Sequence, residues 1–371
     1  MFGKKKSMLQ LAQDEAQNAI NKTNEKIEEL GKETGILHDK LTEIQSAFDL
    51  IRNVPSERKL EYEELKTIRL SWKQQAEKIE KDYNEAVAKS AGAGVAGTGV
   101  GIAVVTMGPT VAMGVATTFG VASTGTAIST LSGAAATNAA LAWLGGGALA
   151  TGGGGMAAGE AFLALAGPVG WAIAGVALLA SGLMVWKTRT DHKRLESVFT
   201  TISQRDVRSY DLAIVELSER ITRIIDESSK LMNATKRIKS FGQDYNMMSE
   251  QQQYELGSYV NLMSASTQLL VNPIKGIQPK YTSEDLDEFV LWKERKVDER
   301  ICDKFRNIIV SLANFLYKID LNDKDKKLLW KSLRKNKKFR KSVEISKKEF
   351  DMSIFDAVYE ALNYKYSGES A

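Results

Sequence analysis

The chain has few of the residues on which metal and redox sites depend. Its 371 residues include one cysteine, Cys302, and two histidines, His38 and His192. One cysteine excludes an intrachain disulfide and any CxxC zinc or redox motif. Two histidines far apart in the sequence do not provide a multi-histidine metal site. We therefore expect no metal and no cofactor, and we expect Cys302 to be a core residue.

Motifs of catalysis are also missing. Gly92 to Gly97 spells GxGxxG, but no predicted strand precedes it and no acidic residue follows some 20 positions on, so the match carries no dinucleotide site. No GxxxxGK[ST] loop and no GxSxG elbow occurs. The net charge of +4 is spread too evenly to favour nucleic acid. We expect no enzyme, no small-molecule substrate and no nucleic-acid partner.

Charge is nearly absent from the middle of the chain. Ser90 to Trp186 is 97 residues long, carries one formal charge (Glu160) and holds 22 of the 29 glycines. We call residues 90–186 the central segment. It divides the chain into N-terminal coiled-coil helices (1–89), a hydrophobic membrane-inserting region (90–186), second coiled-coil helices (187–272) and a basic C-terminal helical module (282–371).

Both flanks of the central segment have apolar residues at helical spacing on an otherwise charged sequence, which is typical of helices that pack in a bundle. A break is expected at Pro55, because proline disfavours helix in the residue before it. The first flank carries its stripe at Ile20, Ile27, Leu30, Leu37, Leu41, Ile44, Phe48 and Ile51, and again at Leu65, Ile68, Trp72, Ala76, Ile79, Tyr83 and Ala86.

The second flank predicts one very long helix. Its stripe runs from Leu195 to Ile238, and no proline occurs between Pro168 and Pro273. A helix over about 188–242 would be roughly 80 Å long. A further helix should end at Asn272-Pro273. Pairing the stripes of the two flanks is the simplest way to bury them, so we expect an all-α fold, a long antiparallel coiled coil or helical bundle.

The last 90 residues predict a small helical module with no strand. One helix should carry Val297, Ile301, Phe305, Ile308, Leu312 and Phe315, and a last one should run from Ile354 to Tyr366. Between them, Lys331 to Lys348 contains nine Lys or Arg and one Glu. Such a run is most often a solvated helix face, and next a surface attracted to anionic lipid. A nucleic-acid surface is the third alternative, and the least favoured because no aromatic residues are interleaved.

The central segment predicts a membrane hairpin. Ala161 to Trp186 has 26 uncharged residues, and as a helix it would span about 39 Å, enough for a bilayer core of about 30 Å. An aromatic residue and a cationic run end it, as at a membrane interface. The stretch 91–125 has smaller side chains and more glycine, so it offers less apolar area. This favours a segment that inserts into the membrane only on a trigger. The alternatives are a helix buried in a soluble bundle for 161–186 and a buried glycine-rich packing element for 91–125.

These patterns give the candidate site residues. Membrane insertion is assigned to Val100, Ile102, Val104, Val105, Val111, Val115, Val121, Phe162, Leu163, Leu165, Trp171, Ile173, Val176, Leu178, Leu179, Leu183, Val185 and Trp186. Lipid headgroups are assigned to Lys187, Arg189, Lys193 and Arg194.

Two helical flanks around an uncharged Gly/Ala-rich block resemble the organisation of the helical pore-forming toxins, namely the cytolysin A family and the haemolysin BL and Nhe components of bacilli. The resemblance covers residues 8–272 and rests on organisation, with no sequence motif. It implies a soluble helical bundle whose apolar head inserts and oligomerises into a pore. Three features depart from the pattern: no signal peptide is expected after Lys4 to Lys6, the apolar block is longer than such a head, and 282–371 has no counterpart.

The leading hypothesis is a membrane-inserting protein that permeabilises a bilayer, as a toxin or a membrane-depolarising defence effector. The expected partners are an anionic lipid bilayer and either copies of itself or other subunits. We expect it on a membrane, soluble before insertion, at the cytoplasmic face or after non-classical export. The alternatives are a membrane-anchored coiled-coil scaffold that binds a partner protein, and a phage or secretion-system structural protein with a buried glycine-rich core.

Overall fold

The computed structural model describes residues 7–57, 59–70, 188–271, 280–281, 283–336, 340 and 345–367. The all-α class is confirmed for these residues, which contain helices and no strand. Their one β-type contact is an isolated bridge between Arg52 and Asp244. The residues predicted to form the membrane hairpin lie outside the described part of the chain.

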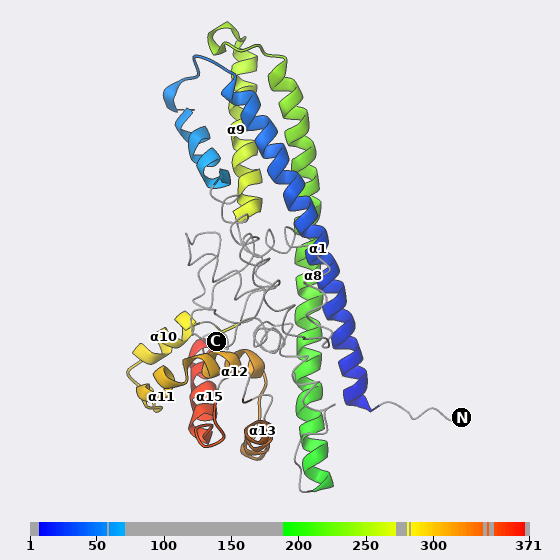
Figure 1. Ribbon diagram of the computed structural model, residues 1–371, viewed down its shortest axis with the longest axis vertical. Coiled ribbons are helices and arrows are strands. Elements are labelled where there is room, and N and C mark those ends of the chain that lie inside the picture. Colours follow the sequence, from blue (N-terminus) through cyan, green and yellow to red (C-terminus); the bar gives the residue numbers. More distant parts are fainter. Residues whose placement is uncertain are drawn as a thin grey trace, which may run out of the picture.

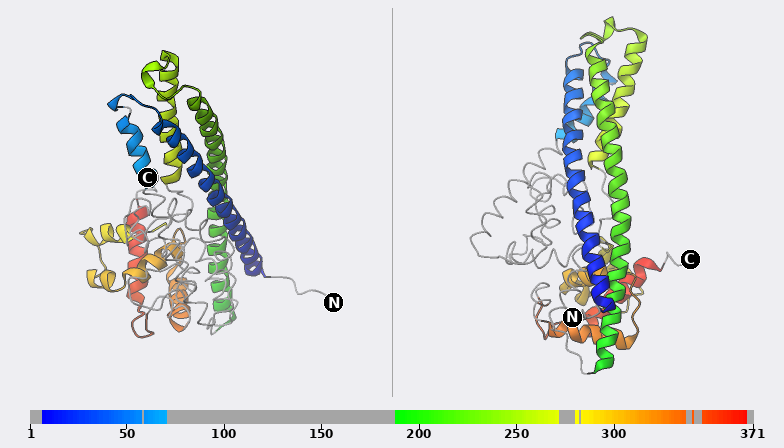
Figure 2. Two further views of the ribbon diagram at one scale, coloured as in Figure 1. Left: turned by 45° about the horizontal axis from the view of Figure 1, so that its top comes forward. Right: turned by 90° about the vertical axis from the view of Figure 1, so that its right-hand side faces the viewer.

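Two long helices, α1 (Met8–Asp49) and α8 (Arg189–Lys239), lie side by side and form the axis of the molecule (Figure 1 and Figure 2). Leu9, near the start of α1, shares a core with Leu195, near the start of α8. Phe48 and Ile238, near the two helix ends, share the other core. The helices therefore run parallel, and both begin at the lower end of Figure 1. The expected antiparallel pairing of the two flanks was wrong.

The parallel arrangement has a simple physical reason. Spacing of three and four residues places apolar side chains on one helix face but does not encode the direction of the partner helix. Direction is fixed by the connection, and a long crossover permits parallel neighbours. The chain between Asp49 and Arg189 is long enough to return to the lower end of the molecule before α8 begins.

Antiparallel neighbours do occur at the upper end. A helix over 59–70 runs back along α1, with Tyr62 at Asp49 and Arg69 at Thr42. Helix α9 (Glu250–Val271) runs back along α8 and ends just before Asn272-Pro273, as predicted. Its side chains meet α8 at an ion pair between Arg237 and Glu255.

The α1–α8 seam is built from the predicted stripes. Leu37 and Leu41 of α1 and Leu217, Ile224 and Leu231 of α8 are completely buried. Toward the lower end the α1 stripe becomes alanine-rich, with buried Ala12, Ala16 and Ala19. As expected from the absence of proline, α8 is one uninterrupted helix of 51 residues, about 76 Å long.

The loops after α1 and after α8 are tied together at the upper end. The break in the first flank falls just before Pro55, as predicted, because α1 ends at Asp49. After α8 the chain turns at Gly242, whose φ of +87° is a conformation that glycine adopts at low cost. A short 3₁₀ helix, η3 (Tyr245–Met247), follows. Arg52 then exchanges backbone hydrogen bonds with residues 243 and 245 at 2.9 and 3.0 Å.

The C-terminal module packs beside the lower half of α8 (Figure 1). Its helices are α10 (Ser283–Leu291), α11 (Glu299–Lys304), α12 (Arg306–Leu316), α13 (Asp323–Lys335) and α15 (Met352–Tyr366). The single helix expected across Val297 to Phe315 is divided into α11 and α12 by a change of backbone conformation at Phe305. Because of this turn, Cys302 and Ile308 on either side of it are buried in the same core.

That core is completed by α8. Leu195, Phe199 and Ile202, from the first turns of α8, are buried in one cluster with the side chains of α10 to α15. The rings of Phe199 and Phe315 lie 6.1 Å apart between centroids. The first turns of α8, which follow the central segment in sequence, are therefore part of the core of the C-terminal module.

Candidate functional site

The predicted insertion residues, Val100 to Val121 and Phe162 to Trp186, lie outside the described residues, as does the predicted headgroup residue Lys187. The structure describes the chain up to residue 70 before the central segment and again from residue 188 after it. The first attachment is the helix over 59–70 and its contacts with α1, and the second is the start of α8. These two attachments are the candidate site, because they are the described parts of the chain nearest in sequence to the segment to which insertion is assigned.

At the first attachment, the helix over 59–70 buries Tyr62, Leu65 and Arg69 against α1. The ring of Tyr62 stacks on Phe48 with centroids 5.4 Å apart. Ile68, which the sequence placed on the buried stripe, is 38% exposed. The helix is therefore turned so that an arginine, rather than the predicted isoleucine, faces α1.

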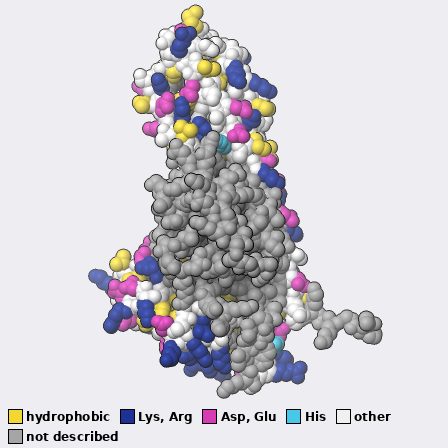
Figure 3. All heavy atoms as spheres, in the orientation of Figure 1, with side chains coloured by type: hydrophobic (Ala, Val, Ile, Leu, Met, Phe, Trp, Pro, Cys, Tyr) yellow, Lys and Arg dark blue, Asp and Glu magenta, His cyan; other side chains and the backbone are white. Residues whose placement is uncertain are grey.

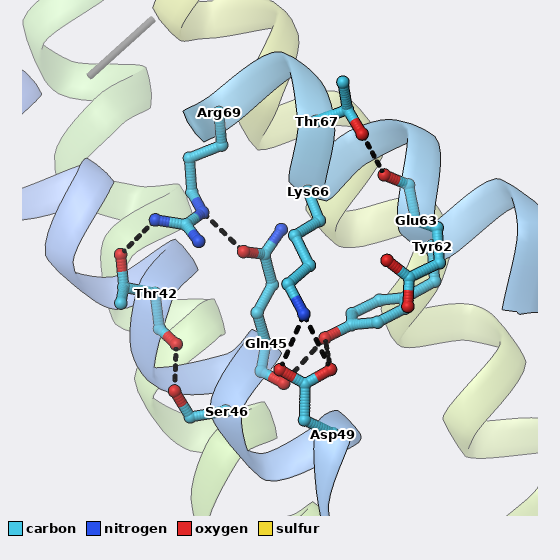
Figure 4. A network of polar contacts seen from close by, with 9 residues as sticks. All are labelled: Thr42, Gln45, Ser46, Asp49, Tyr62, Glu63, Lys66, Thr67 and Arg69. Atoms are coloured by element: carbon cyan, nitrogen blue, oxygen red, sulfur yellow. Dashed lines mark hydrogen bonds and ion pairs between the residues drawn. The ribbon is translucent and has the colours of Figure 1, made fainter. Parts of the chain in front are cut away.

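Arg69 is the centre of a polar network (Figure 4). Its side chain is buried, with a relative exposure of 5% for the residue. Its Nε donates to Oε1 of Gln45, and its Nη1 donates to Oγ1 of Thr42 at 2.8 Å and lies 3.5 Å from Nε2 of His38. Burial lowers the pKa of Arg69. Neutral acceptors thus satisfy a buried cation whose guanidinium hydrogen-bonds no carboxylate among the described residues.

A second set of contacts is centred on Asp49, about two helical turns from Thr42 on α1. The Tyr62 hydroxyl donates to Oδ1 of Asp49 at 2.5 Å and lies 2.8 Å from the carbonyl oxygen of Gln45. Lys66 pairs with the same Asp49 carboxylate at 3.0 Å. Burial, and then the hydrogen bond to Asp49, raise the pKa of Tyr62. Gln45 therefore contributes its side chain to Arg69 and its backbone to Tyr62.

At the second attachment, α8 begins with a capped N-terminus. The side chain of Thr188 accepts a hydrogen bond from the backbone N–H of Asp191 at 3.1 Å. Of the predicted headgroup residues, Arg189 and Lys193 are exposed. Arg194 is ion-paired with Asp325 of α13 at 2.7 Å and is 37% exposed. The structure thus presents two of these cations to solvent and joins the third to the C-terminal module.

Three turns further along α8, an arginine and an aspartate make further contacts with the module. Arg205 donates to Oδ1 of Asp206 and to the backbone carbonyl oxygens of Phe315 and Tyr317, at 2.9 and 2.5 Å for the two carbonyls. Asp206 is 5% exposed, and its Oδ2 has no hydrogen-bond partner among the described residues. Burial raises the pKa of Asp206 to about 6, although Arg205 acts in the opposite direction.

Arg69 and Asp206 were both missed by the reading of the sequence. A weak signal was present, because each falls in register with buried apolar residues: Arg69 seven residues after Tyr62, and Asp206 between Ile202 and Tyr210. A charged residue at a stripe position is usually a surface residue at the edge of the stripe. Whether such a residue is buried or exposed depends on the helix that packs against it, which the local sequence does not reveal.

Two further findings bear on the site. Among the described helices, none is both long and apolar enough to cross a bilayer. Within the same residues, no group of three or more His, Cys, Asp or Glu side chains is placed to hold a metal ion. No protein-family model, curated protein or solved structure matches the chain. Function must therefore be argued from the residues themselves.

Proposed function

We propose that this protein inserts into and permeabilises a lipid bilayer, as a pore-forming toxin or a membrane-depolarising defence effector. The observation that carries the proposal is the central segment, 97 residues with one formal charge, placed between two helices that pack on the same body. A run of this length with a single charge is far longer than a helix needs to span a bilayer.

The two attachments support a conditional insertion. The first combines the apolar contacts of Tyr62 and Leu65 with polar contacts of Arg69 and Lys66, and polar contacts lose little free energy when water replaces them. The second is anchored in a large apolar core through Phe199. In the proposed transition the helix over 59–70 leaves α1 while α8 and the C-terminal module stay together, and several copies or partner subunits assemble around the inserted segments.

The direct test is release of a trapped dye from anionic vesicles by the purified chain. We expect release by the wild-type protein and loss of release in Val105→Asp and Ala174→Asp, because a carboxylate in the bilayer core costs several kcal/mol, about 3 on insertion scales. Val215→Asp is the matched control, since Val215 is 65% exposed on α8. Equal release by all three variants would contradict the assignment of insertion to the central segment.

A membrane-anchored scaffold is the second candidate. It is favoured by an apolar patch on the C-terminal module, where Leu291 is 80% exposed next to Trp292 and Tyr364, two partly buried rings that lie 5.2 Å apart. Exposed apolar side chains of this kind are typical of protein-binding surfaces. A constitutive anchor requires detergent for extraction and releases no dye, whereas a conditional inserter is purified from the aqueous fraction.

A further inference from the structure

The strongest charged surface in the described part of the chain is on α13. This helix of 13 residues has six basic and two acidic side chains. Lys324, Lys327, Lys331 and Lys335 are all exposed. Their spacing of three, four and four residues places them on one helix face, over a length of about 16 Å. We call these four residues the lysine stripe.

Other side chains of α13 pack within the module, whereas the lysine stripe faces solvent. Leu329, Ser332 and Leu333 are buried in the core of the module. Lys326 lies 4.1 Å from the centre of the Tyr359 ring, and Arg334 lies 5.1 Å from the Trp330 ring. No ion pair with a described residue neutralises a lysine of the stripe, whereas Asp325 pairs with Arg194.

The stripe lies at the end of the molecule where α8 begins. The Arg194–Asp325 ion pair joins α13 to the first turns of α8, and exposed Arg189 and Lys193 precede that pair. Figure 3 shows Lys and Arg side chains gathered at this lower end. The cations of two separate elements thus lie at the same end of the molecule.

We propose that the lysine stripe docks the protein onto an anionic membrane surface before the central segment inserts. This inference rests on the proposed function for the identity of the partner. Clusters of four or more basic residues on an amphipathic helix bind acidic lipid headgroups by charge. Lysine stems are flexible and their ammonium groups need no fixed acceptor geometry, which suits a fluid surface of headgroups. The one aromatic residue of α13, Trp330, lies against Arg334, so the stripe lacks the base-stacking platform of a single-stranded nucleic-acid site.

Vesicle flotation with the full-length chain tests the proposal. The vesicles contain phosphatidylcholine with phosphatidylserine, or phosphatidylcholine alone, at low and high salt. We expect binding that depends on phosphatidylserine and weakens at high salt. Changing all four lysines to glutamine should weaken it by about several hundred-fold, because each basic residue near an anionic surface contributes a factor of about five.

Two further variants separate charge from structure. The quadruple Lys→Arg variant keeps the charge and should bind as the wild type does. A matched control replaces four exposed lysines away from the stripe, Lys22, Lys59, Lys236 and Lys239, by glutamine and should retain most of the affinity. Equal weakening by the stripe and control variants would overturn the proposal, as would tighter binding to a soluble polyanion such as RNA than to the vesicles.

Dye release recorded on the same vesicles separates this inference from the proposed function. Salt-sensitive binding that needs the lysine stripe but is accompanied by no release would support the docking surface and contradict permeabilisation. Release that is unaffected by the quadruple Lys→Gln change would support permeabilisation and overturn the docking surface.

Discussion

Arg69 is the side chain at the first attachment whose loss should be most costly. In Arg69→Ala, the amide of Gln45 and the hydroxyl of Thr42 lose a buried donor. We expect the free energy of unfolding to fall by about 2–4 kcal/mol, because buried polar groups are left unsatisfied. Lys59→Ala, at an exposed position of the same helix, should change it by no more than about 0.5 kcal/mol. Equal effects in chemical denaturation would mean that the network does not hold the helix.

Asp206 should make stability depend on pH in an unusual direction. Burial raises its pKa to about 6 in the folded protein from an ordinary value of 3.8, so the folded state binds this proton more tightly than the unfolded chain does. Stability from this group is therefore present below about pH 4 and is lost as the pH rises through about 6. The whole effect is on the order of 3 kcal/mol.

Asp206→Asn removes this titration. The variant should therefore lose less stability than the wild type between pH 4 and pH 7, whatever its absolute stability. Guanidinium denaturation at a series of pH values measures the difference between the two curves. Parallel curves would show that Asp206 has an ordinary pKa in the folded protein.

At the scale of the helix, the α1–α8 seam offers a test with an internal control. Leu217 is completely buried in the seam, whereas Leu212 on the same helix is 70% exposed. Leu217→Ala should lower the free energy of unfolding by about 2–5 kcal/mol, through lost apolar contact and the cavity left behind. Leu212→Ala should stay within about 0.5 kcal/mol of the wild type. A similar shift in the denaturation midpoint for both variants would contradict the burial of Leu217 between α1 and α8.

The helices themselves were predictable from the sequence because their signals are local. The uninterrupted spacing in α8, the break before Pro55 and the end of α9 before Pro273 depend only on neighbouring residues. The direction of α1 relative to α8 was not predictable, since an apolar stripe reads alike in both directions. The turn at Phe305 was missed because the apolar spacing continues through it.

The candidate site was predictable only in part. The sequence located the headgroup cations beside the central segment, and the structure finds Arg189 and Lys193 exposed there. It gave no reason to expect that Arg194 would pair with Asp325, which lies 131 residues further along the chain. Contacts between distant segments depend on the packing of the whole chain. The assignment of insertion to residues such as Val105 and Trp171 remains a prediction.

At the scale of the whole molecule, the C-terminal module should depend on α8. Phe199 and Ile202 are part of its core, and Arg205 binds the carbonyl oxygens that follow α12. Residues 280–371 expressed alone should therefore lack a cooperative thermal transition, because they lack the α8 side chains that complete their core. Residues 188–371 should regain it. A cooperative transition of the shorter fragment, followed by near-ultraviolet circular dichroism, would show that the module is independent.

The pairing of α1 with α8 also means that α1 is synthesised well before the helix that covers it. About 190 residues separate the ends of the two helices, Asp49 and Lys239. At about 5–20 residues per second, α1 leaves the ribosome roughly 10–40 s before its partner is complete. During that interval the leucines of its seam have no α8 to cover them, and the central segment is made in the same interval. Nascent chains of this protein should therefore be clients of a ribosome-associated chaperone.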